Sequence, residues 1–431
     1  MPDPFDFIRG ARTGRMLLLL AAVVSLALGA GPGAGLAAGK TVDPKVSSIV
    51  PGDAVALGFD PAKLDVARQG LKADVAAGKI PGAYLLIGRH GKVAFEEGFG
   101  VQGPGQATSV SNETIFRVFS MTKPVVSVVA MTLVEQGKLD LDAPVSKYLP
   151  EFATLRVWQA DGTTVAATKP MLVRNLMSHT SGLIYGFIQP MSPIGKAWDA
   201  GGENRNDLTA REYARLIAKL PLKAEPGTAW NYSRSTDVLG AVVEVAGGKT
   251  LDVLVRERVT GPLGMTDTAF FQPEAKRARF AEPKAASPEV FYDYAKPTPF
   301  LTAGGGLSST TEDYLRFVLM LAGNGEYKGV RIIKPETLAR MRQDETTPAI
   351  RQAGQFFPGR GMGFGLGFSL VTDDTVQRPG TGTFSWWGIA GTEFWVDPKN
   401  DAFMVFMIQN RELAMDYQRK NRAWFYDALV K

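Results

Sequence analysis

Extended patterns lie at both ends of this chain, and this order constrains the fold more than any other feature. Near the amino end, the apolar runs 83–87 and 93–99 flank a Gly-containing turn, which is typical of a β-hairpin. Strand patterns return only after Pro297, at residues 364–371, 393–396 and 402–408. A helical domain inserted into an α/β domain explains this order simply.

The middle of the chain carries helical patterns broken by Pro and Gly. They cover residues 120–136, 143–148, 172–177, 209–220 and 235–245. Two more helices are expected near the ends, at 61–77 with Asp60 as its N-cap and at 415–429. We therefore predict an α/β fold in which residues 38–108 and 295–431 form one domain. Residues 109–294 are predicted to form a mostly helical domain inserted into it.

Residues 1–37 have the layout of a secretory signal peptide. Arg9, Arg12 and Arg15 precede an apolar run at 16–28, and small residues follow it. Cleavage is expected after Gly29 or Ala37, and an uncleaved membrane anchor is the alternative. The mature chain is then expected to be periplasmic or secreted, and to contact a membrane only if this segment stays attached.

Composition removes several classes of function. A hydrophobic fraction of 45%, a charged fraction of 21% and a net charge of +5 are those of a globular protein. No Lys/Arg block suggests nucleic-acid binding. The chain has no cysteine, which excludes disulfides, thiol catalysis and zinc–thiolate sites. It has two histidines and no His pair at ligand spacing, so neither a metal nor an organic cofactor is predicted. The sequence does not indicate an oligomeric state.

Ser120 and Lys123 open the most apolar helical pattern outside the signal segment, which runs on through Val125 to Val134. Residues i and i+3 share a helix face, so the lysine can lie beside the hydroxyl. A hydroxyl is a weak nucleophile until a base takes its proton, and a desolvated lysine has a lowered pKa. About one Ser-x-x-Lys match is expected by chance in a chain of this length, so the motif alone leaves a core helix as the alternative.

A Ser-His-Asp arrangement is the competing chemistry. His90 falls in the hairpin turn and His179 at an expected helix-to-loop transition, and both are interpreted as structural. A Gly-x-Ser-x-Gly elbow is absent from the sequence. Another group must then move protons. Tyr232 is a candidate if a cation such as Lys123 stabilises its phenolate, and side-chain packing is the alternative.

An ordered series of motifs resembles the class C β-lactamase-like serine hydrolases, which include penicillin-binding proteins, D-aminopeptidases and family VIII carboxylesterases. Besides Ser120-x-x-Lys123 and Tyr232, the series comprises residues 114–117, 137–141, 179–183, 226–233, 261–265 and 304–309. The likeness covers nearly the whole mature chain and is closest to the family VIII carboxylesterases. It implies a β-lactamase-like fold, an antiparallel sheet flanked by helices with the helical domain inserted.

The resemblance also implies roles for residues. Ser120 matches the acylated nucleophile, and Lys123 and Tyr232 match the groups that share its proton. The segment Trp386-Trp387-Gly388 looks like the family's Lys-Thr-Gly motif in a variant form. The N–H groups of Ser120 and Ile389 then become the candidate oxyanion hole.

Two departures from the β-lactamase pattern bear on the substrate. Tyr-x-Asn is replaced by Tyr232-Ser233-Arg234, and the lysine of Lys-Thr-Gly is replaced by Trp386. Groups that meet a substrate amide and carboxylate are therefore missing, which favours apolar small-molecule esters. Trp386, Trp387, Gly388 and Arg234 are the predicted substrate-binding residues, Arg234 as a contact for an anion. The expected function is an exported ester hydrolase. The alternatives are a β-lactamase or D-amino-acid peptidase on the same scaffold, and a non-catalytic cell-wall binding or assembly protein.

Overall fold

The computed structural model describes residues 40–284 and 296–430 of the chain. The predicted signal peptide, residues 1–37, and the predicted domain boundary at 294/295 lie outside these residues. Within the described residues, none of the helices combines the length and the apolar character needed to cross a membrane.

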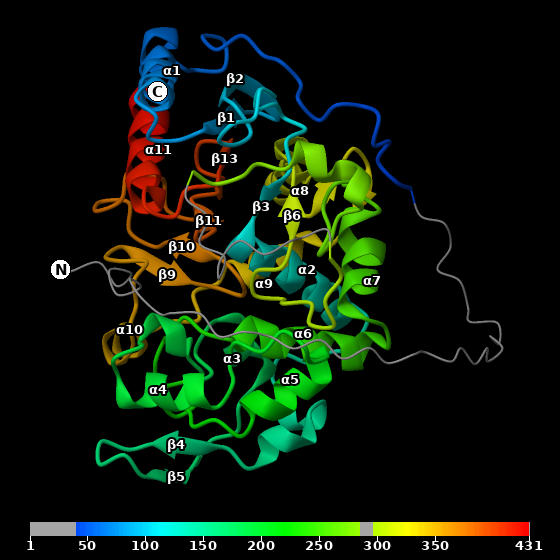
Figure 1. Cartoon of the computed structure of the whole chain (residues 1–431), viewed down its shortest axis with the longest axis vertical. Helices are drawn as coiled ribbons and strands as arrows, with labels where there is room; N and C mark the ends of the chain where they lie inside the picture. Colours follow the sequence, from blue (N-terminus) through cyan, green and yellow to red (C-terminus); the bar gives the residue numbers. More distant parts are fainter. Residues whose placement is uncertain (1–39, 285–295, 431) are drawn as a thin grey trace, which may run out of the picture.

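A seven-stranded antiparallel sheet combines strands from the two ends of the chain (Figure 1). Its order is β2-β1-β13-β12-β11-β10-β9, so the amino-terminal hairpin pairs with the last strand. The strands are β1 (Gly82–Arg89), β2 (Lys92–Gly100), β9 (Met362–Phe364), β10 (Ser369–Val371), β11 (Phe384–Trp387), β12 (Glu393–Asp397) and β13 (Ala402–Ile408). The expected α/β fold with an antiparallel sheet is confirmed.

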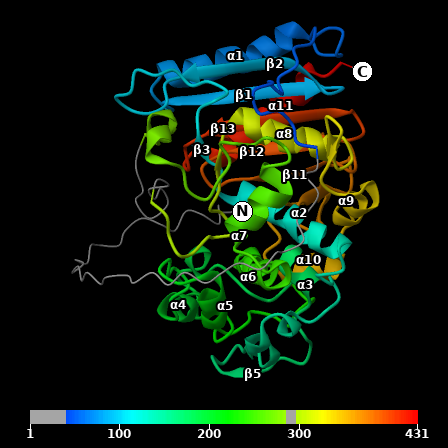
Figure 2. The ribbon, with the colours of Figure 1, turned by 90° about the vertical axis from the view of Figure 1, so that its right-hand side faces the viewer.

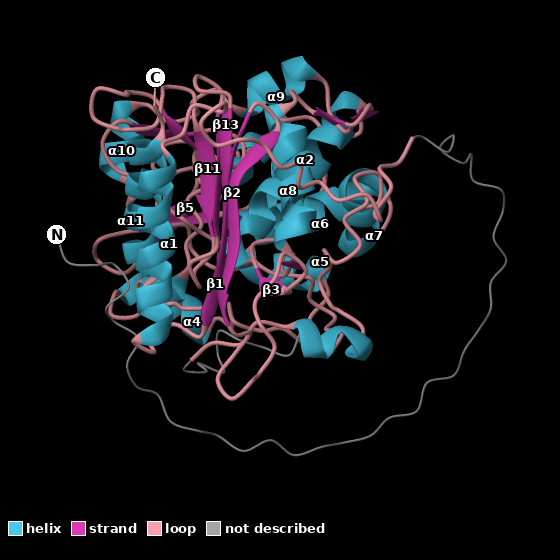
Figure 3. Ribbon diagram, turned by 90° about the horizontal axis from the view of Figure 1, so that it is seen from above, coloured by secondary structure: helices cyan, strands magenta, loops and turns pink. Residues whose placement is uncertain are grey.

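Helices α1 (Pro61–Ala76) and α11 (Ala414–Ala428) cover one face of the sheet (Figure 3). Leu64 and Leu71 of α1 pack with Phe425 of α11 and with alternate residues of β1 and β13. Asp60 caps α1 by accepting a hydrogen bond from the Ala62 N–H at 2.8 Å, as the sequence predicts. The two ends of the chain therefore form one layer against one sheet.

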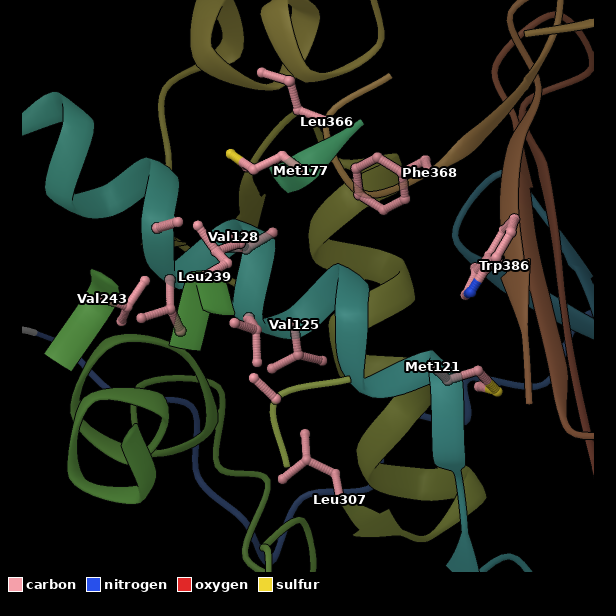
Figure 4. Close-up of a cluster of buried hydrophobic side chains, with 14 of the residues drawn as sticks. Met121, Val125, Val128, Met177, Leu239, Val243, Leu307, Leu366, Phe368 and Trp386 are labelled. Carbon is pink, nitrogen blue, oxygen red and sulfur yellow. The ribbon is translucent and has the colours of Figure 1, made fainter. Parts of the chain in front are cut away.

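The opposite face of the sheet packs on α8 (Thr311–Ala322) and, beyond it, on α2 (Thr122–Glu135) and α6 (Ser235–Gly247). The Tyr314 ring of α8 lies 5.3 Å from the Phe394 ring of β12. Figure 2 shows the same layers in order, from α1 through the sheet to the helical part. Apolar residues of α2 and α6 form the interior of this part, and some of them are drawn in Figure 4. Helix α2 is thus buried at the centre of the molecule.

The helical part consists of short elements around α2 and α6. They are α3 (Val173–Met177), α4 (Pro193–Ala200), α5 (Ala210–Ile217) and α7 (Leu251–Val255). After α8 come α9 (Pro335–Met341) and α10 (Pro348–Ala353). Short strand pairs complete the structure: β3 (Phe116–Arg117) with β6 (Ser308–Ser309), β4 (Arg156–Trp158) with β5 (Thr164–Ala166), and β7 (Glu326–Tyr327) with β8 (Val330–Arg331).

Two expected elements are wrong in detail. The single strand expected at 364–371 is two strands, β9 and β10, because the chain turns at Gly365 and Gly367, where φ of Gly367 is +98°. The helix expected at 143–148 is only a 3₁₀ turn, Val145–Lys147. Helix α8 was not expected at all. Its residues are buried almost all round, including the charged residues Asp313 and Arg316, so its pattern does not separate a solvent side from a core side.

Candidate active site

The backbone before Ser120 adopts a conformation that non-glycine residues rarely take. Phe119 has a φ of +44°, and a 3₁₀ turn, Phe119–Met121, then leads into α2. Three contacts hold this turn: the Val118 N–H donates to Leu307 O at 3.1 Å, the Leu307 N–H to the Thr122 hydroxyl at 3.0 Å, and the Tyr314 hydroxyl to Met121 O at 2.9 Å. Ser120 is half-buried at the start of a buried helix. Such strain, fixed by surrounding contacts, is common at functional sites.

Lys123 lies directly behind the Ser120 hydroxyl. Its Nζ is 3.0 Å from Ser120 Oγ and 2.5 Å from Gly304 O, and the residue is 2% exposed. Burial lowers the pKa of Lys123 to about 7, although the Asp237 carboxylate acts to raise it, and Arg234 lowers it further. A large fraction of the amine is therefore neutral near pH 7 and able to accept a proton.

Tyr232 approaches the same oxygen from the other side. Its hydroxyl donates to Ser120 Oγ at 2.6 Å, and Lys123 Nζ lies 4.5 Å from the centre of its ring. Trp386 Nε1–H donates to the Tyr232 hydroxyl at 3.4 Å. Burial raises the pKa of Tyr232, and the hydrogen bonds with Ser120 and Trp386 oppose this only in part. The resting phenol is protonated, so the geometry favours Lys123 as the base and Tyr232 as a proton relay.

Strand β11 brings the Trp386-Trp387-Gly388 segment beside the nucleophile. A Cβ on Gly388 would lie 2.6 Å from Val118 O, and the Thr392 hydroxyl donates to the same carbonyl oxygen at 3.3 Å. The backbone of the β11–β12 turn therefore touches the residue two positions before Ser120. Ile389 lies in this turn and is half-buried. This closeness is the geometric basis for an oxyanion hole at the Ser120 and Ile389 N–H groups, which stays a prediction.

Arg234 is held by two carboxylates. Its guanidinium lies 3.5 Å from Glu203 and 3.6 Å from Asp237, and it stacks 4.9 Å from the centre of the Tyr185 ring. Its side chain is 13% exposed. These contacts give Arg234 a structural role behind Lys123. They do not favour the predicted contact with a substrate anion, which stays a prediction.

The sequence reasoning missed Asp237, which lies on α6. Its carboxylate accepts the Gly304 N–H at 2.9 Å and the Thr302 hydroxyl at 2.7 Å. It thereby fixes the loop whose Gly304 carbonyl contacts Lys123. Its place in the first turn of a mostly apolar helical pattern, Ser235–Val245, which carries one other carboxylate, Glu244, was the signal that could have revealed it.

Neither histidine contacts the nucleophile. His90 is exposed in the β1–β2 turn, with Nδ1 2.7 Å from Asp401 Oδ2. His179 is buried, its ring packs 4.7 Å from that of Tyr232, and its Nδ1 lies 3.3 Å from Ser233 Oγ. Burial lowers the pKa of His179 well below its usual value, and Lys123 adds to this effect. Both positions fit the structural interpretation of these residues.

Two cavities, of about 450 and 530 Å³, lie away from these residues. The first is lined by residues such as Arg89 and Tyr426, and the second by residues such as Glu151 and Leu220. Neither lining includes Ser120, Lys123 or Tyr232. Among the residues that the structure describes, no group of three His, Cys, Asp or Glu side chains could hold a metal ion.

A buried lysine and a tyrosine both contact a serine that follows the strained residue Phe119, and on this α/β scaffold they are typical of the serine hydrolases that carry a Ser-x-x-Lys motif. The chain belongs to the Beta-lactamase family, whose model matches residues 67–428.

The chain is also similar to individual proteins of this kind. Esterase EstB of Burkholderia gladioli is 32% identical over 352 residues, covering 74% of this chain and 83% of EstB. The solved structure of EstCE1, a hydrolase with promiscuous acyltransferase activity, has a TM-score of 0.70 and is 29% identical. It covers 86% of this chain and 100% of EstCE1. The D-alanyl-D-alanine-carboxypeptidase/endopeptidase AmpH of Escherichia coli is 28% identical over 288 residues, covering 65% of this chain and 67% of AmpH.

Proposed function

We propose that this chain is an exported serine hydrolase that cleaves carboxylic esters through an acyl-enzyme on Ser120. One observation carries the proposal: Ser120 Oγ lies 3.0 Å from Lys123 Nζ and 2.6 Å from the Tyr232 hydroxyl. A base and a proton relay thus meet at a single hydroxyl, which is what nucleophilic catalysis by serine requires.

Acylation begins when Ser120 Oγ attacks the ester carbonyl carbon and its proton passes to neutral Lys123. The negative charge that develops on the carbonyl oxygen is held by the N–H groups of Ser120 and Ile389. The bond to the alcohol oxygen then breaks. That oxygen takes a proton from Tyr232, and Lys123 returns a proton to Tyr232. An alkoxide is more basic than a phenolate, so Tyr232 can donate even with a raised pKa.

Deacylation uses the same groups in reverse. A water molecule passes a proton to Lys123 through Tyr232 and attacks the acyl carbon. The bond to Ser120 Oγ breaks, the oxygen regains its proton from Lys123, and the carboxylic acid leaves. The reaction consumes one ester and one water and restores the free enzyme.

The surroundings of Ser120 favour small-molecule esters over anionic substrates. Trp386, 1% exposed, occupies the position where the β-lactamase motif has lysine. No carboxamide stands two residues after Tyr232, and Arg234 is paired with Glu203 and Asp237. The names of EstB, an esterase, and EstCE1, a hydrolase, agree with ester hydrolysis. AmpH supports the peptidase alternative only weakly, because its sequence identity and coverage are lower.

The test compares rates on short-chain p-nitrophenyl esters and on a chromogenic cephalosporin. We expect much faster ester hydrolysis, and the reverse preference would overturn the ester assignment in favour of a β-lactamase. Ser120→Ala should abolish both turnover and labelling by a fluorophosphonate. Ser109→Ala, at an exposed serine outside the site, is the matched control and should label normally. A wild-type chain that neither labels nor hydrolyses any ester would point to the non-catalytic binding protein.

Export is supported by the arginines and the apolar run of residues 1–37, which precede a stretch of small residues. A periplasmic or secreted location follows from export. The mass of the mature chain tests whether residues 1–37 are removed.

A further inference from the structure

Aromatic side chains from two other segments gather beside Tyr232. Strand β11 supplies Trp386 and Trp387, and the loop between α10 and β9 supplies Phe357. The Phe357 ring lies 5.3 Å from the Tyr232 ring, 6.1 Å from that of Trp386 and 6.0 Å from that of Trp387. It also meets Trp230 edge-on at 5.1 Å. Phe357, Tyr232 and Trp387 are all half-buried, so each ring of this aromatic wall keeps part of its surface exposed.

The loop that carries Phe357 is fixed to the backbone near Tyr232. The Trp230 N–H donates to Ile350 O at 3.2 Å, and the Gln355 N–H donates back to Trp230 O at 2.9 Å. Gly354 lies so close that a Cβ there would be 1.9 Å from Trp230 O. The backbone of the loop is therefore held beside Trp230, and Phe357 has a defined place in the wall.

The chemistry decides which part of an ester meets this wall. Tyr232 donates its proton to the leaving alcohol, so the alcohol oxygen lies at the Tyr232 hydroxyl during acylation. Trp386 contacts that same hydroxyl through Nε1–H. Rings packed around Tyr232 and Trp386 thus face the alcohol part of the substrate, and an apolar ring there gains by burial and by ring–ring contact.

We propose that Phe357 is a specificity-determining residue that, with Trp387, binds the alcohol part of the ester and selects flat aromatic alcohols. The inference rests on the proposed ester hydrolysis at Ser120 and names the substrate class for that site.

The adjacent residue provides a matched control. Phe356 packs edge-on against Trp230 at 5.2 Å, and the Arg351 guanidinium lies 5.5 Å from the centre of its ring. Phe356 lies in the same loop as Phe357, but the ring that it packs on is Trp230 and not Tyr232, Trp386 or Trp387. A Phe356→Ala enzyme therefore reports the general effect of loosening the loop.

The experiment uses the mature enzyme and three acetate esters whose leaving groups are all alkoxides: 1-naphthylmethyl, benzyl and ethyl acetate. All three give the same acetyl-Ser120, so differences in kcat/KM arise in acylation, and comparing variant with wild type cancels intrinsic reactivity. Phe357→Ala should lower kcat/KM for 1-naphthylmethyl acetate by roughly 10-fold. The loss should be smaller for benzyl acetate and smallest for ethyl acetate. Phe357→Leu should restore part of the loss, and Phe356→Ala should leave the order of the three esters unchanged.

Specific results would overturn the inference. An equal loss on all three acetates would mean that Phe357 only positions Tyr232. A loss of kcat/KM that differs between p-nitrophenyl acetate and p-nitrophenyl butyrate would depend on the acyl group. The wall would then bind the acid part of the ester. The deacylation rate of acetyl-Ser120 should not change, because the alcohol has left by then. A wild type that hydrolyses none of these esters removes the proposed function itself, and that failure appears before any variant is made.

Discussion

At the scale of single residues, burial separates the roles of the two groups that contact Ser120. The same apolar surroundings lower the pKa of Lys123 to about 7 and raise that of Tyr232. Burial disfavours charge on either group, so both favour their neutral forms. A neutral amine accepts a proton and a neutral phenol donates one. The pair thus begins the reaction in the protonation states that acylation needs.

Asp237 should set the pH at which the enzyme becomes active. Its negative charge favours protonated Lys123, so removing it in Asp237→Asn lowers the pKa of Lys123 further. In the wild type, kcat/KM should rise with pH and reach half its maximum near pH 7. In Asp237→Asn the rising limb should move to lower pH by about one unit. The measurement is kcat/KM for p-nitrophenyl acetate between pH 5 and 9.

Thr302→Val is the control for this prediction. It removes a hydrogen bond to the same carboxylate but leaves the charge of Asp237 in place. The rising limb of the kcat/KM profile should then stay near pH 7. A limb that moves to higher pH in Asp237→Asn, or does not move, would contradict the assignment of Lys123 as the titrating base.

The sequence pointed to the residues that belong to motifs and missed those defined by tertiary contacts. Ser120, Lys123 and Tyr232 could be proposed as a site because their motifs follow one another in order, and the structure brings them together although Tyr232 is 112 positions from Ser120. Asp237 and Phe357 belong to no motif. Asp237 matters because Gly304, 67 positions further on, folds back to it, and Phe357 because its loop is held beside Trp230.

At the scale of elements, a buried carboxylate joins the first and last helices. Asp74 of α1 is 4% exposed and accepts hydrogen bonds from the Tyr417 hydroxyl at 3.0 Å, from Lys420 at 2.8 Å and from Lys79 at 2.7 Å. Burial alone raises the pKa of Asp74, but these three donors outweigh it and lower the pKa to about 2. The contact therefore stabilises the α1–α11 layer as long as Asp74 is charged.

Replacing this carboxylate should cost stability in a defined pH range. We expect Asp74→Asn to lower the free energy of unfolding by about 1–2 kcal/mol at pH 7, a figure reduced because Lys79 and Lys420 are partly exposed to solvent. A lowered carboxyl pKa stabilises the fold above the unfolded-state pKa of about 4 and no longer does so below the folded-state value. The difference between variant and wild type should thus shrink as the pH falls from about 4 to about 2.

Urea unfolding at pH 7, 4 and 3 measures this difference. Asp65→Asn, on the exposed side of the same helix, is the matched control and should leave the unfolding midpoint unchanged. An Asp74→Asn chain as stable as the wild type at pH 7 would show that the contact contributes nothing net.

At the scale of the whole molecule, the order of the sequence patterns predicted the architecture. The individual patterns were less accurate in predicting their own strands and helices. The hairpin β1–β2 and the strand β13 were each visible as apolar runs, and their pairing in one sheet follows from the helical insertion between them. The division of residues 364–371 into β9 and β10 was not predicted, nor was the buried helix α8. Each depends on tertiary surroundings that the local sequence pattern does not record. The periodicity and polarity of a sequence segment indicate which of its residues contact water, and almost no residue of α8 does.

The first described residues bear on how the chain is processed. The Val42 N–H donates to Pro262 O at 2.8 Å, Val42 is buried, and the Ser48 hydroxyl donates to Glu312 at 2.7 Å. Cleavage after Gly29 or Ala37 leaves these contacts in place. If residues 1–37 direct export, as proposed, the chain made with them in a Gram-negative host should appear in the periplasm with a new amino terminus at residue 30 or 38.

Mass spectrometry of the periplasmic and membrane fractions measures this terminus. A chain made in the cytoplasm from residue 38 onward, after an initiating Met, is the control. It should unfold at the same temperature as the processed chain and hydrolyse p-nitrophenyl esters at the same rate, because Val42 and Ser48 anchor the mature chain in both. Full-length mass confined to the membrane fraction would instead identify residues 1–37 as an uncleaved anchor. The ester-hydrolysing site would then be tethered to a membrane, with its fold and chemistry unchanged.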